Sequence, residues 1–209
     1  MEFTLKFNKT AIAFAIILIS LNLSAQDRTA LPDVFSTSYG YENNAEYSKA
    51  IEVMKKVYDE SSYEINLRLG WLTYQSGLFT ESIAYYNKAI ALMPLSIEAK
   101  LGYALPASSA GNWSQVITRY NEVLKLDPNH YTTNYRLGLI YYGRKDYQNA
   151  FRHFERIVNL YPFDYDALIM TAWSNYQLGK LREAKILFGK ALLNKPGDTS
   201  ALEGMGLIK

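Results

Sequence analysis

The chain has 209 residues, of which 49% are hydrophobic and 20% charged, and its formal net charge is +2. This composition is typical of a folded globular protein, and the small, dispersed charge argues against a nucleic-acid-binding surface. The sequence has no cysteine and only two histidines, which excludes disulfides and thiolate metal sites and leaves little material for imidazole chemistry.

Residues 1–25 have the order of a secretory signal peptide. Lys6 and Lys9 precede an apolar run over residues 11–23, and the small residues Ser24 and Ala25 follow it. The run is shorter than the roughly 20 apolar residues that span a bilayer. We therefore predict cleavage after Ala25, a mature protein without a membrane span, and export to the periplasm or beyond. Leu23 is larger than the residue usually found at a cleavage site, so an uncleaved membrane anchor stays open as the alternative.

Two segments follow before the regular part of the sequence begins. Residues 26–43 carry no clear pattern, and we expect a weakly ordered segment there. Residues 44–60 place Tyr47, Ala50 and Met54 at helical spacing, which predicts a capping helix.

A constant period runs through the rest of the chain. Four prolines keep the same step from one to the next: Pro94, Pro128, Pro162 and Pro196. Eight residues before each proline stands an aromatic residue: Tyr86, Tyr120, Phe154 and Phe188. Twenty-four residues before each proline stands a very small one: Gly70, Ala104, Gly138 and Ala172. The period predicts repeated structural units.

Each unit reads as two helices joined by a tight turn. Apolar residues recur at steps of three and four, and Gly77, Gly111 and Gly179 stand where a left-handed residue ends the first helix. Proline then ends the second helix, because it lacks a backbone donor. Pro106 falls inside the first helix of the second unit, where we expect a kink or a break.

These residues resemble the tetratricopeptide repeat family, best in the stretch LGLIYYGRKDYQNAFRHFERIVNLYP. The resemblance covers four full units, residues 63–96, 97–130, 131–164 and 165–198. It implies an all-α fold, a right-handed α-solenoid of stacked antiparallel helix pairs with partial caps. Residues 199–209 begin a fifth unit and read as a C-terminal cap whose Leu202, Met205 and Ile208 cover the last pair. Self-association through this end is the alternative.

The resemblance also implies a concave groove lined by the first helix of each unit. Mapped residue by residue, its partner-facing positions are Leu67, Trp71, Tyr74, Gln75, Leu105, Tyr135, Leu139, Tyr142, Ile169, Trp173, Tyr176 and Gln177. Large aromatic residues dominate binding surfaces, which favours capture of a peptide segment. The alternative is that these rings pack between neighbouring first helices. The lysine and asparagine clamp that some family members use for a terminal carboxylate is absent, but Arg68 and Arg136 are candidate contacts for an acidic ligand group.

No nucleophile with a base, no metal-ligand cluster and no phosphate loop appears at usable spacing, so we expect no enzymatic activity, no metal and no cofactor. The sequence favours a protein-binding module or assembly scaffold of the cell envelope whose partner is another protein or a peptide segment. A glycan-binding or polysaccharide-export accessory protein using the same aromatic groove is the alternative.

Overall fold

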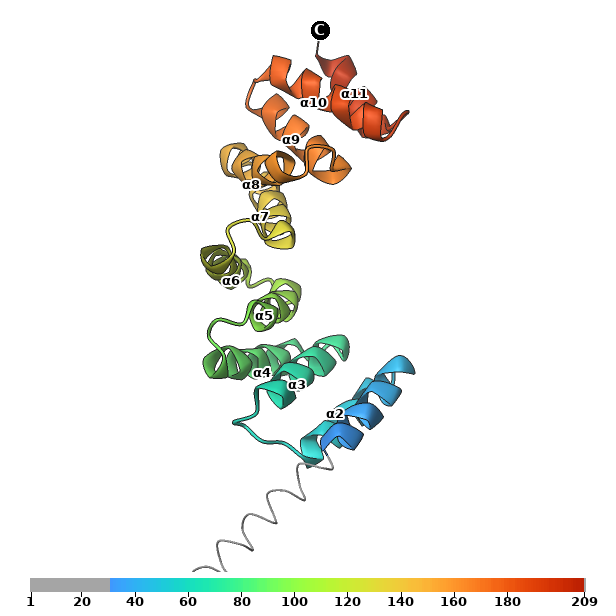
Figure 1. Ribbon diagram of the computed structural model, residues 1–209, viewed down its shortest axis with the longest axis vertical. Helices are drawn as coiled ribbons and strands as arrows, with labels where there is room; N and C mark the ends of the chain where they lie inside the picture. The colour runs from blue at the N-terminus through green and yellow to red at the C-terminus, as the bar shows by residue number, and fades with distance from the viewer. Residues whose placement is uncertain (1–30, 209) are drawn as a thin grey trace, which may run out of the picture. The chain divides into compact units, whose positions relative to one another are not determined.

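The computed structural model describes residues 31–208, so the signal segment predicted over residues 1–25 lies outside the described residues. The described residues form an all-α repeat fold and contain no strand, as the sequence predicted. They divide after Pro94 into two compact parts, and Figure 1 shows the helices of each.

The first part begins with a helix over residues 31–43, followed by α2 (Tyr47–Lys56), α3 (Tyr63–Gln75) and α4 (Phe79–Leu92). The expectation of a weakly ordered segment over residues 26–43 is therefore wrong for residues 31–43. Apolar side chains of this helix, among them Val34 and Phe35, pack on a core that α2 and α3 share around Met54 and Leu69. This helix is stabilised by its contact with the apolar core of α2 and α3. Residues 31–43 carry no repeat pattern from which this contact could have been predicted.

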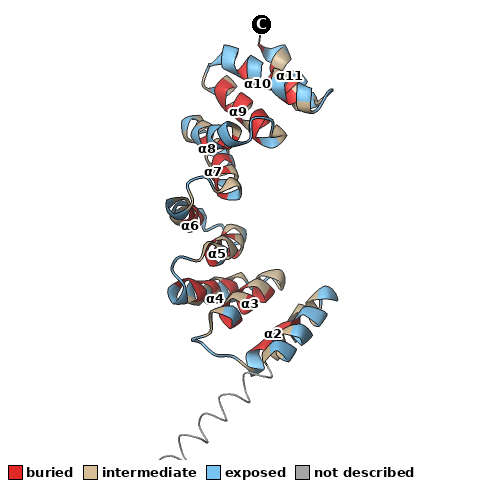
Figure 2. Ribbon diagram, viewed as in Figure 1, coloured by how far each residue is buried: buried red, intermediate tan, exposed pale blue. Residues whose placement is uncertain are grey.

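The second part contains seven helices within residues 95–208: α5 (Ile97–Ser109), α6 (Trp113–Leu126), α7 (Tyr131–Gly143), α8 (Tyr147–Leu160), α9 (Tyr165–Gln177), α10 (Leu181–Asn194) and α11 (Thr199–Leu207). Buried residues gather where paired helices face each other (Figure 2). At one such contact, a side chain on Gly138 would meet the Phe154 ring at 2.5 Å, so the small residue lets the two helices of the pair approach.

A side-chain cap begins the first helix of every unit. The capping residues recur at the repeat period and are Ser62, Ser96, His130, Asp164 and Asp198, each accepting a hydrogen bond from the backbone N–H three residues on. Such a cap satisfies one of the free donors of a helix start and contributes about 1 kcal/mol. Helix starts are therefore encoded in each unit separately.

The turn inside each unit needs a left-handed residue. Gly77, Gly111 and Gly179 supply it with φ angles of 78°, 75° and 74°, as their positions predicted. In the third unit the corresponding residue is Lys145, which adopts a φ of 61° without being glycine. The repeat geometry thus overrides the residue's own preference.

We expected a kink or a break at Pro106, and the break does not occur, because helix α5 continues through this residue. The proline lies in the last turn and is buried there, and helical backbone continues to Ser109. Proline removes one backbone donor, but a single missing bond near the end of a helix leaves the neighbouring bonds in place. The cap at Ser96 and the packing of the buried face keep the helix in one piece.

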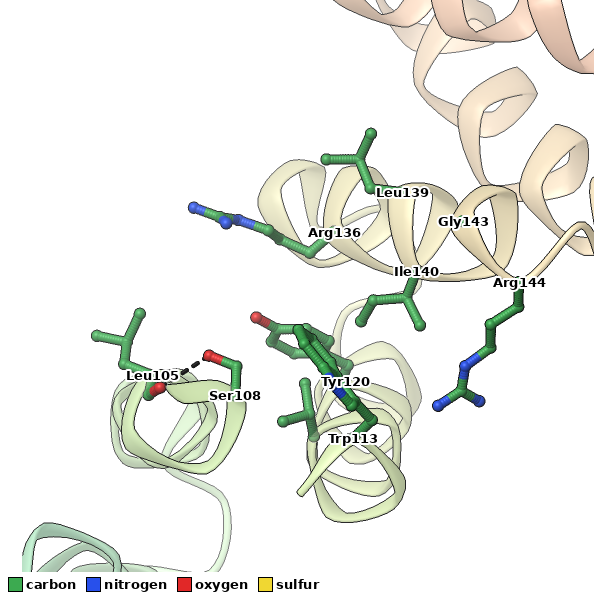
Figure 3. A pocket seen from close by; sticks show the side chains of 10 residues that line it. Leu105, Ser108, Trp113, Tyr120, Arg136, Leu139, Ile140, Gly143 and Arg144 are labelled. Carbon is green, nitrogen blue, oxygen red and sulfur yellow. Dashed lines mark hydrogen bonds between the residues drawn. The ribbon is translucent and has the colours of Figure 1, made fainter. Parts of the chain in front are cut away.

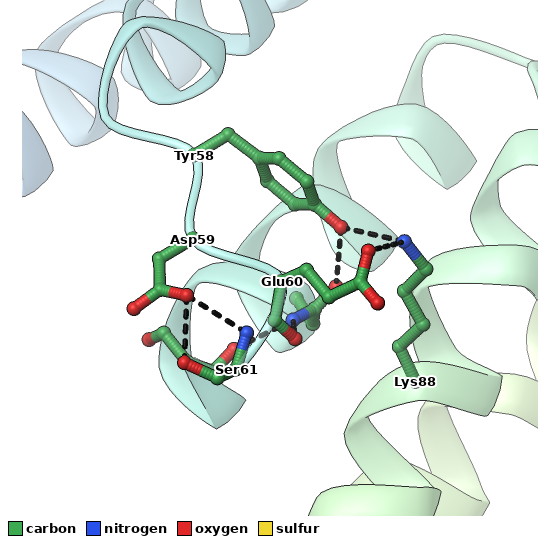
Figure 4. Close-up of polar contacts among 7 residues, drawn as sticks. Tyr58, Asp59, Glu60, Ser61 and Lys88 are labelled. Carbon is green, nitrogen blue, oxygen red and sulfur yellow. Dashed lines mark hydrogen bonds and ion pairs between the residues drawn. The ribbon is translucent and has the colours of Figure 1, made fainter.

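Repeated asparagines tie the loops to the first helices. The Asn66 amide donates to the carbonyls of Glu60 and Ser62 at 3.0 and 2.7 Å, and Asn134 donates in the same way to the carbonyls of Pro128 and His130. At the first of these loops, the Lys88 ammonium of α4 donates to the Tyr58 hydroxyl at 2.8 Å (Figure 4). These bonds fix the path of the chain between successive helix pairs.

The C-terminal residues cover the last helix pair only in part. Ile208 is buried and Met205 packs against the core of α9 and α10, whereas Leu202 is 52% exposed. Two of the three residues expected to cover this pair therefore do so. The third lies on the surface.

Candidate partner-binding site

The groove residues predicted in the first part are half-buried, and Trp71 and Tyr74 contact other side chains of the chain. The Trp71 indole N–H donates to the Glu42 carboxylate, and its ring lies 5.9 Å from that of Tyr74. Leu67 and Gln75 are half-buried beside them on α3. Part of the predicted groove surface is thus bonded to the helix over residues 31–43. The sequence did not predict this contact.

Arg68 is not free to contact an acidic ligand group, so this prediction is wrong. Its side chain is only 6% exposed, its guanidinium donates to the Ser38 hydroxyl and to the Glu42 carboxylate, and it lies 4.0 Å from the Tyr39 ring centre. A buried charge is stable only when paired, and Ser38 and Glu42 meet that need from the preceding helix.

In the last helix pairs the predicted residues are likewise partly used for packing. The Trp173 indole donates to the Ser200 hydroxyl of α11 at 2.8 Å, and its ring meets Phe188 edge-on at 5.0 Å. Ile169 is buried, Tyr176 is half-buried and Gln177 is exposed. Trp71 and Trp173 are therefore placed differently, because Trp71 is bonded to the helix over residues 31–43, which precedes it, and Trp173 to α11, which follows it.

The second part contains an open pocket between α5, α6 and α7, which we call the α5–α7 pocket. It has a volume of about 570 Å³, and the residues that line it are Leu105, Ser108, Trp113, Val116, Tyr120, Arg136, Leu139, Ile140, Gly143 and Arg144. Figure 3 shows Ser108 on α5 pointing across the space toward Tyr120, with Leu105 beside it on the same helix. The volume is in the range of pockets that bind small molecules or the side chains of a peptide.

One residue of the second unit that lines the pocket differs from its counterparts in the other units. Where three units carry tyrosine, at Tyr74, Tyr142 and Tyr176, the second unit carries Ser108. The Ser108 hydroxyl donates to the Leu105 carbonyl within its own helix, and no ring fills the space beside α7. Gly143 on the facing helix adds no side chain either, so the apolar walls stay apart.

Two large apolar side chains of the pocket are open to solvent. Trp113 is 45% exposed and Leu139 is 37% exposed, whereas Val116 and Tyr120 are buried and form its inner wall. Burial raises the pKa of the Tyr120 hydroxyl, and the charge of Arg136 opposes this shift. The pocket thus combines an apolar interior with exposed apolar edges.

Arg136 and Arg144 bring positive charge to the pocket. Both are exposed, and neither forms an ion pair with any residue in the described range 31–208. A guanidinium at the edge of an apolar pocket is placed to receive a carboxylate or a backbone carbonyl of a bound chain. Arg136, predicted as an anion contact, therefore remains a candidate.

Leu105, Leu139 and Arg136, all named above from the sequence, line this pocket. Sequence reasoning missed Trp113 and Tyr120, because the groove positions taken from the family lie on first helices and these two belong to α6. The available signal in the sequence was a tryptophan at the residue that begins a second helix, in register with Phe79 and Tyr147.

Two other predicted groove residues lie elsewhere on α7. The Tyr135 ring meets Phe154 at 5.7 Å, and the Tyr142 ring meets Tyr147 at 5.3 Å. Burial raises the pKa of Tyr142, and a hydrogen bond with Gln177 opposes this shift. Tyr142 and Gln177, both predicted, are thus brought together by adjacent units.

Both histidines have structural roles. The His130 ring accepts a hydrogen bond from the Thr133 backbone N–H and caps α7. The His153 ring lies 3.0 Å from the Asn134 amide oxygen and stacks on Tyr141, and burial lowers its pKa. Among residues 31–208, no three acidic or histidine side chains are grouped so that they could hold a metal ion.

Membrane-spanning helices are distinguished by their length and their hydropathy. No helix within residues 31–208 combines the length and the apolar character that crossing a membrane requires.

Parts of this chain match models of a known protein family. Residues 63–94 and residues 104–165 each match a family model described as tetratricopeptide repeat. The TPR repeat-containing protein YpiA of Bacillus subtilis (strain 168) is 26% identical over 160 residues, which is 75% of this chain and 38% of that protein. The TPR repeat-containing thioredoxin TTL4 of Arabidopsis thaliana is 24% identical over 119 residues, 56% of this chain and 17% of that protein. The chain thus spans well under half of these two relatives.

Solved structures show the same fold. A tetratricopeptide repeat protein from Parabacteroides merdae ATCC 43184 superposes with a TM-score of 0.72 at 20% identity, covering 85% of this chain and 71% of that one. A MamA protein superposes with a TM-score of 0.70 at 22% identity, covering 78% of this chain and 91% of that one. The repeat period, the helix pairs, the two family matches and these structures agree, and the chain is a tetratricopeptide repeat protein.

Proposed function

We propose that this chain is a non-enzymatic binding module of the cell envelope whose protein partner places an apolar peptide segment in the α5–α7 pocket. Tetratricopeptide repeats suggest a protein–protein interaction scaffold and generally perform no chemistry. Exposure of Trp113 at the edge of a pocket with a buried apolar wall is the observation that carries the proposal. Tryptophan is among the residues that contribute most to protein interfaces.

The lining chemistry favours a peptide over a sugar chain. None of the residues that line the α5–α7 pocket is a carboxylate or an amide, the groups that hold sugar hydroxyls, and its polar members are arginine, serine and tyrosine. An apolar side chain of the guest occupies the interior in this arrangement. Arg136 and Arg144 contact its backbone carbonyls or a neighbouring carboxylate.

Location in the envelope rests on residues 1–25. A lysine-containing start, a short apolar run and the Ser24-Ala25 junction favour an exported mature chain that begins at Gln26. N-terminal sequencing of the protein from fractionated cells tests this part of the proposal. A chain that still begins at Met1, or one that stays in the cytoplasmic fraction, would contradict it.

Two substitutions test the pocket directly. Trp113→Ala removes the exposed anchor, and Ser108→Tyr restores the ring that three other units carry and fills the space. A partner is first identified by crosslinking and mass spectrometry in envelope extracts, and its affinity is then measured with purified proteins. We expect both variants to weaken binding by about thirtyfold or more, the effect of losing a dominant interface residue.

Leu181→Ala is the matched control. Leu181 stands two repeat periods after Trp113, also begins a second helix and is 43% exposed, but it lies outside the pocket. Binding by this variant should equal that of the wild type, and all three variants should keep the wild-type melting temperature. Unchanged affinity in Trp113→Ala and Ser108→Tyr would refute the assignment of the pocket.

A further inference from the structure

A second cavity, separate from the α5–α7 pocket, lies between α8, α9 and α10. We call it the α8–α10 pocket, and its volume is about 320 Å³. It lies at a position where the units differ from one another, since Thr73, Ala107, Tyr141 and Asn175 stand one period apart. In the third unit Tyr141 stacks its ring on His153 at 5.6 Å, whereas one period later the corresponding residues are Asn175 and Leu187. Two rings are absent from this position of the fourth unit, and both replacing residues line the cavity.

The cavity contains a buried hydrogen-bond acceptor without a donor. Asn175 is 3% exposed, and its side-chain oxygen has no hydrogen-bond partner among the described residues. Two hydroxyls of its own helix already donate elsewhere, because Thr171 donates to the Ala167 carbonyl and Ser174 to the Met170 carbonyl. Buried polar atoms are nearly always paired in folded proteins, so this oxygen points to a ligand that brings an N–H.

The charges around the cavity favour a cation. Glu155 of α8 and Glu183 of α10 are both exposed, and neither forms an ion pair within residues 31–208. The one cationic residue in the lining is Lys180, whose ammonium lies 4.7 Å from the Phe151 ring centre. Two carboxylates against one ammonium leave the lining with a negative charge.

The walls between these polar groups are apolar. Val158 and Leu187 are half-buried and face the cavity from α8 and α10. The complementary guest therefore has a hydrocarbon stem, a positive charge and several N–H donors in one plane. An arginine side chain has all three, since its guanidinium can donate to an amide oxygen and to a carboxylate at once.

We propose that the α8–α10 pocket binds an arginine side chain of a protein partner, with the guanidinium donating to the Asn175 oxygen and pairing with Glu155 or Glu183. The arginine stem packs on Val158 and Leu187. This site is distinct from the α5–α7 pocket and does not depend on the function proposed for it. It adds to the module a second contact, one that selects a basic partner segment.

The first experiment is an NMR titration of the purified mature chain with Nα-acetylarginine amide. Its control ligand is Nα-acetylcitrulline amide, which has nearly the same shape but no charge. We expect saturable shifts in the amides of α8, α9 and α10 with the arginine ligand and binding about tenfold weaker with citrulline, as the loss of a charged hydrogen bond requires. Added salt should also weaken the arginine complex. Equal binding of both ligands, or no binding of either, would overturn the proposal.

Variants locate the site. Asn175→Tyr restores the ring of the preceding unit, fills the cavity and should abolish the arginine shifts, whereas Gln177→Tyr, on the same helix outside the cavity, should keep them. The double variant Glu155→Gln/Glu183→Gln changes only exposed residues and should weaken binding about tenfold, so the test stands even if Asn175→Tyr folds poorly. Undiminished binding in the double variant refutes the proposal. Ser108→Tyr should leave arginine binding unchanged, which separates this test from that of the α5–α7 pocket.

Discussion

Replacing Glu42 by alanine tests how the helix over residues 31–43 is held on α3. The Glu42 carboxylate receives hydrogen bonds from the Arg68 guanidinium and the Trp71 indole, so one substitution removes both contacts. The Arg68 side chain is 6% exposed and that of Glu42 is 21% exposed. Without Glu42, a buried guanidinium keeps only the Ser38 hydroxyl as a hydrogen-bond acceptor.

Removing one member of a buried ion pair costs about 3 to 5 kcal/mol, because the remaining charge is left without compensation. Glu42 is partly exposed and water can reach Arg68 once the carboxylate has gone, so we expect a loss of about 3 kcal/mol in the free energy of unfolding. Glu42→Ala/Arg68→Met should recover much of this loss, because an apolar side chain of similar length leaves no buried charge.

Hydrogen exchange measured by mass spectrometry reads the effect locally. In Glu42→Ala the amides of residues 31–43 should exchange at least about a hundredfold faster, which corresponds to about 3 kcal/mol of lost protection. Glu60→Ala, which removes a more exposed ion pair with Lys88, is the control and should leave those amides unchanged. If residues 31–43 exchange equally in Glu42→Ala and wild type, the contact does not hold the helix and the reasoning fails.

Two further predictions concern the second part. A methyl group on Gly204 would overlap the Phe188 ring, whereas Gly206 in the same helix has nothing within 4 Å of that position, so urea denaturation should show a loss of about 1 to 3 kcal/mol for Gly204→Ala and none for Gly206→Ala. Burial lowers the pKa of His153 below its unfolded value, so its contribution to stability is complete above about pH 6.5 and is lost as the pH falls through the lowered pKa. The urea midpoint should therefore drop more between about pH 7.5 and about pH 5 in the wild type than in His153→Gln, and equal drops would contradict this assignment.

The repeat fold was predictable because the residues that determine it recur within each unit. The prolines, the small residue facing an aromatic ring and the glycine turns recur at one fixed period, and each acts within one unit or between neighbours. The all-α tetratricopeptide architecture predicted from them is confirmed. The caps recur at the same fixed step, as at Ser62 and Asp198, but their residue types differ and they were not predicted.

The helix over residues 31–43 was missed for a physical reason. It matches no repeat, and its stability comes from contacts with residues about one repeat away, such as Ser38 and Glu42 with Arg68. The same contacts turned Arg68 from a candidate ligand contact into a buried structural residue. The spacing of apolar residues predicts which face of a helix is buried. It does not predict which residue will pair with a charged side chain on that face.

The sequence by itself determined the period and the helix pairs. Only the tertiary structure decided what individual residues do within them: Ser108 and Asn175 border pockets, helix α5 continues through Pro106, and Lys145 adopts a left-handed backbone like that of a glycine. The reason is that a periodic pattern is read from neighbours along the chain. A cavity is the space left among side chains from three helices, and it exists only once those helices have packed.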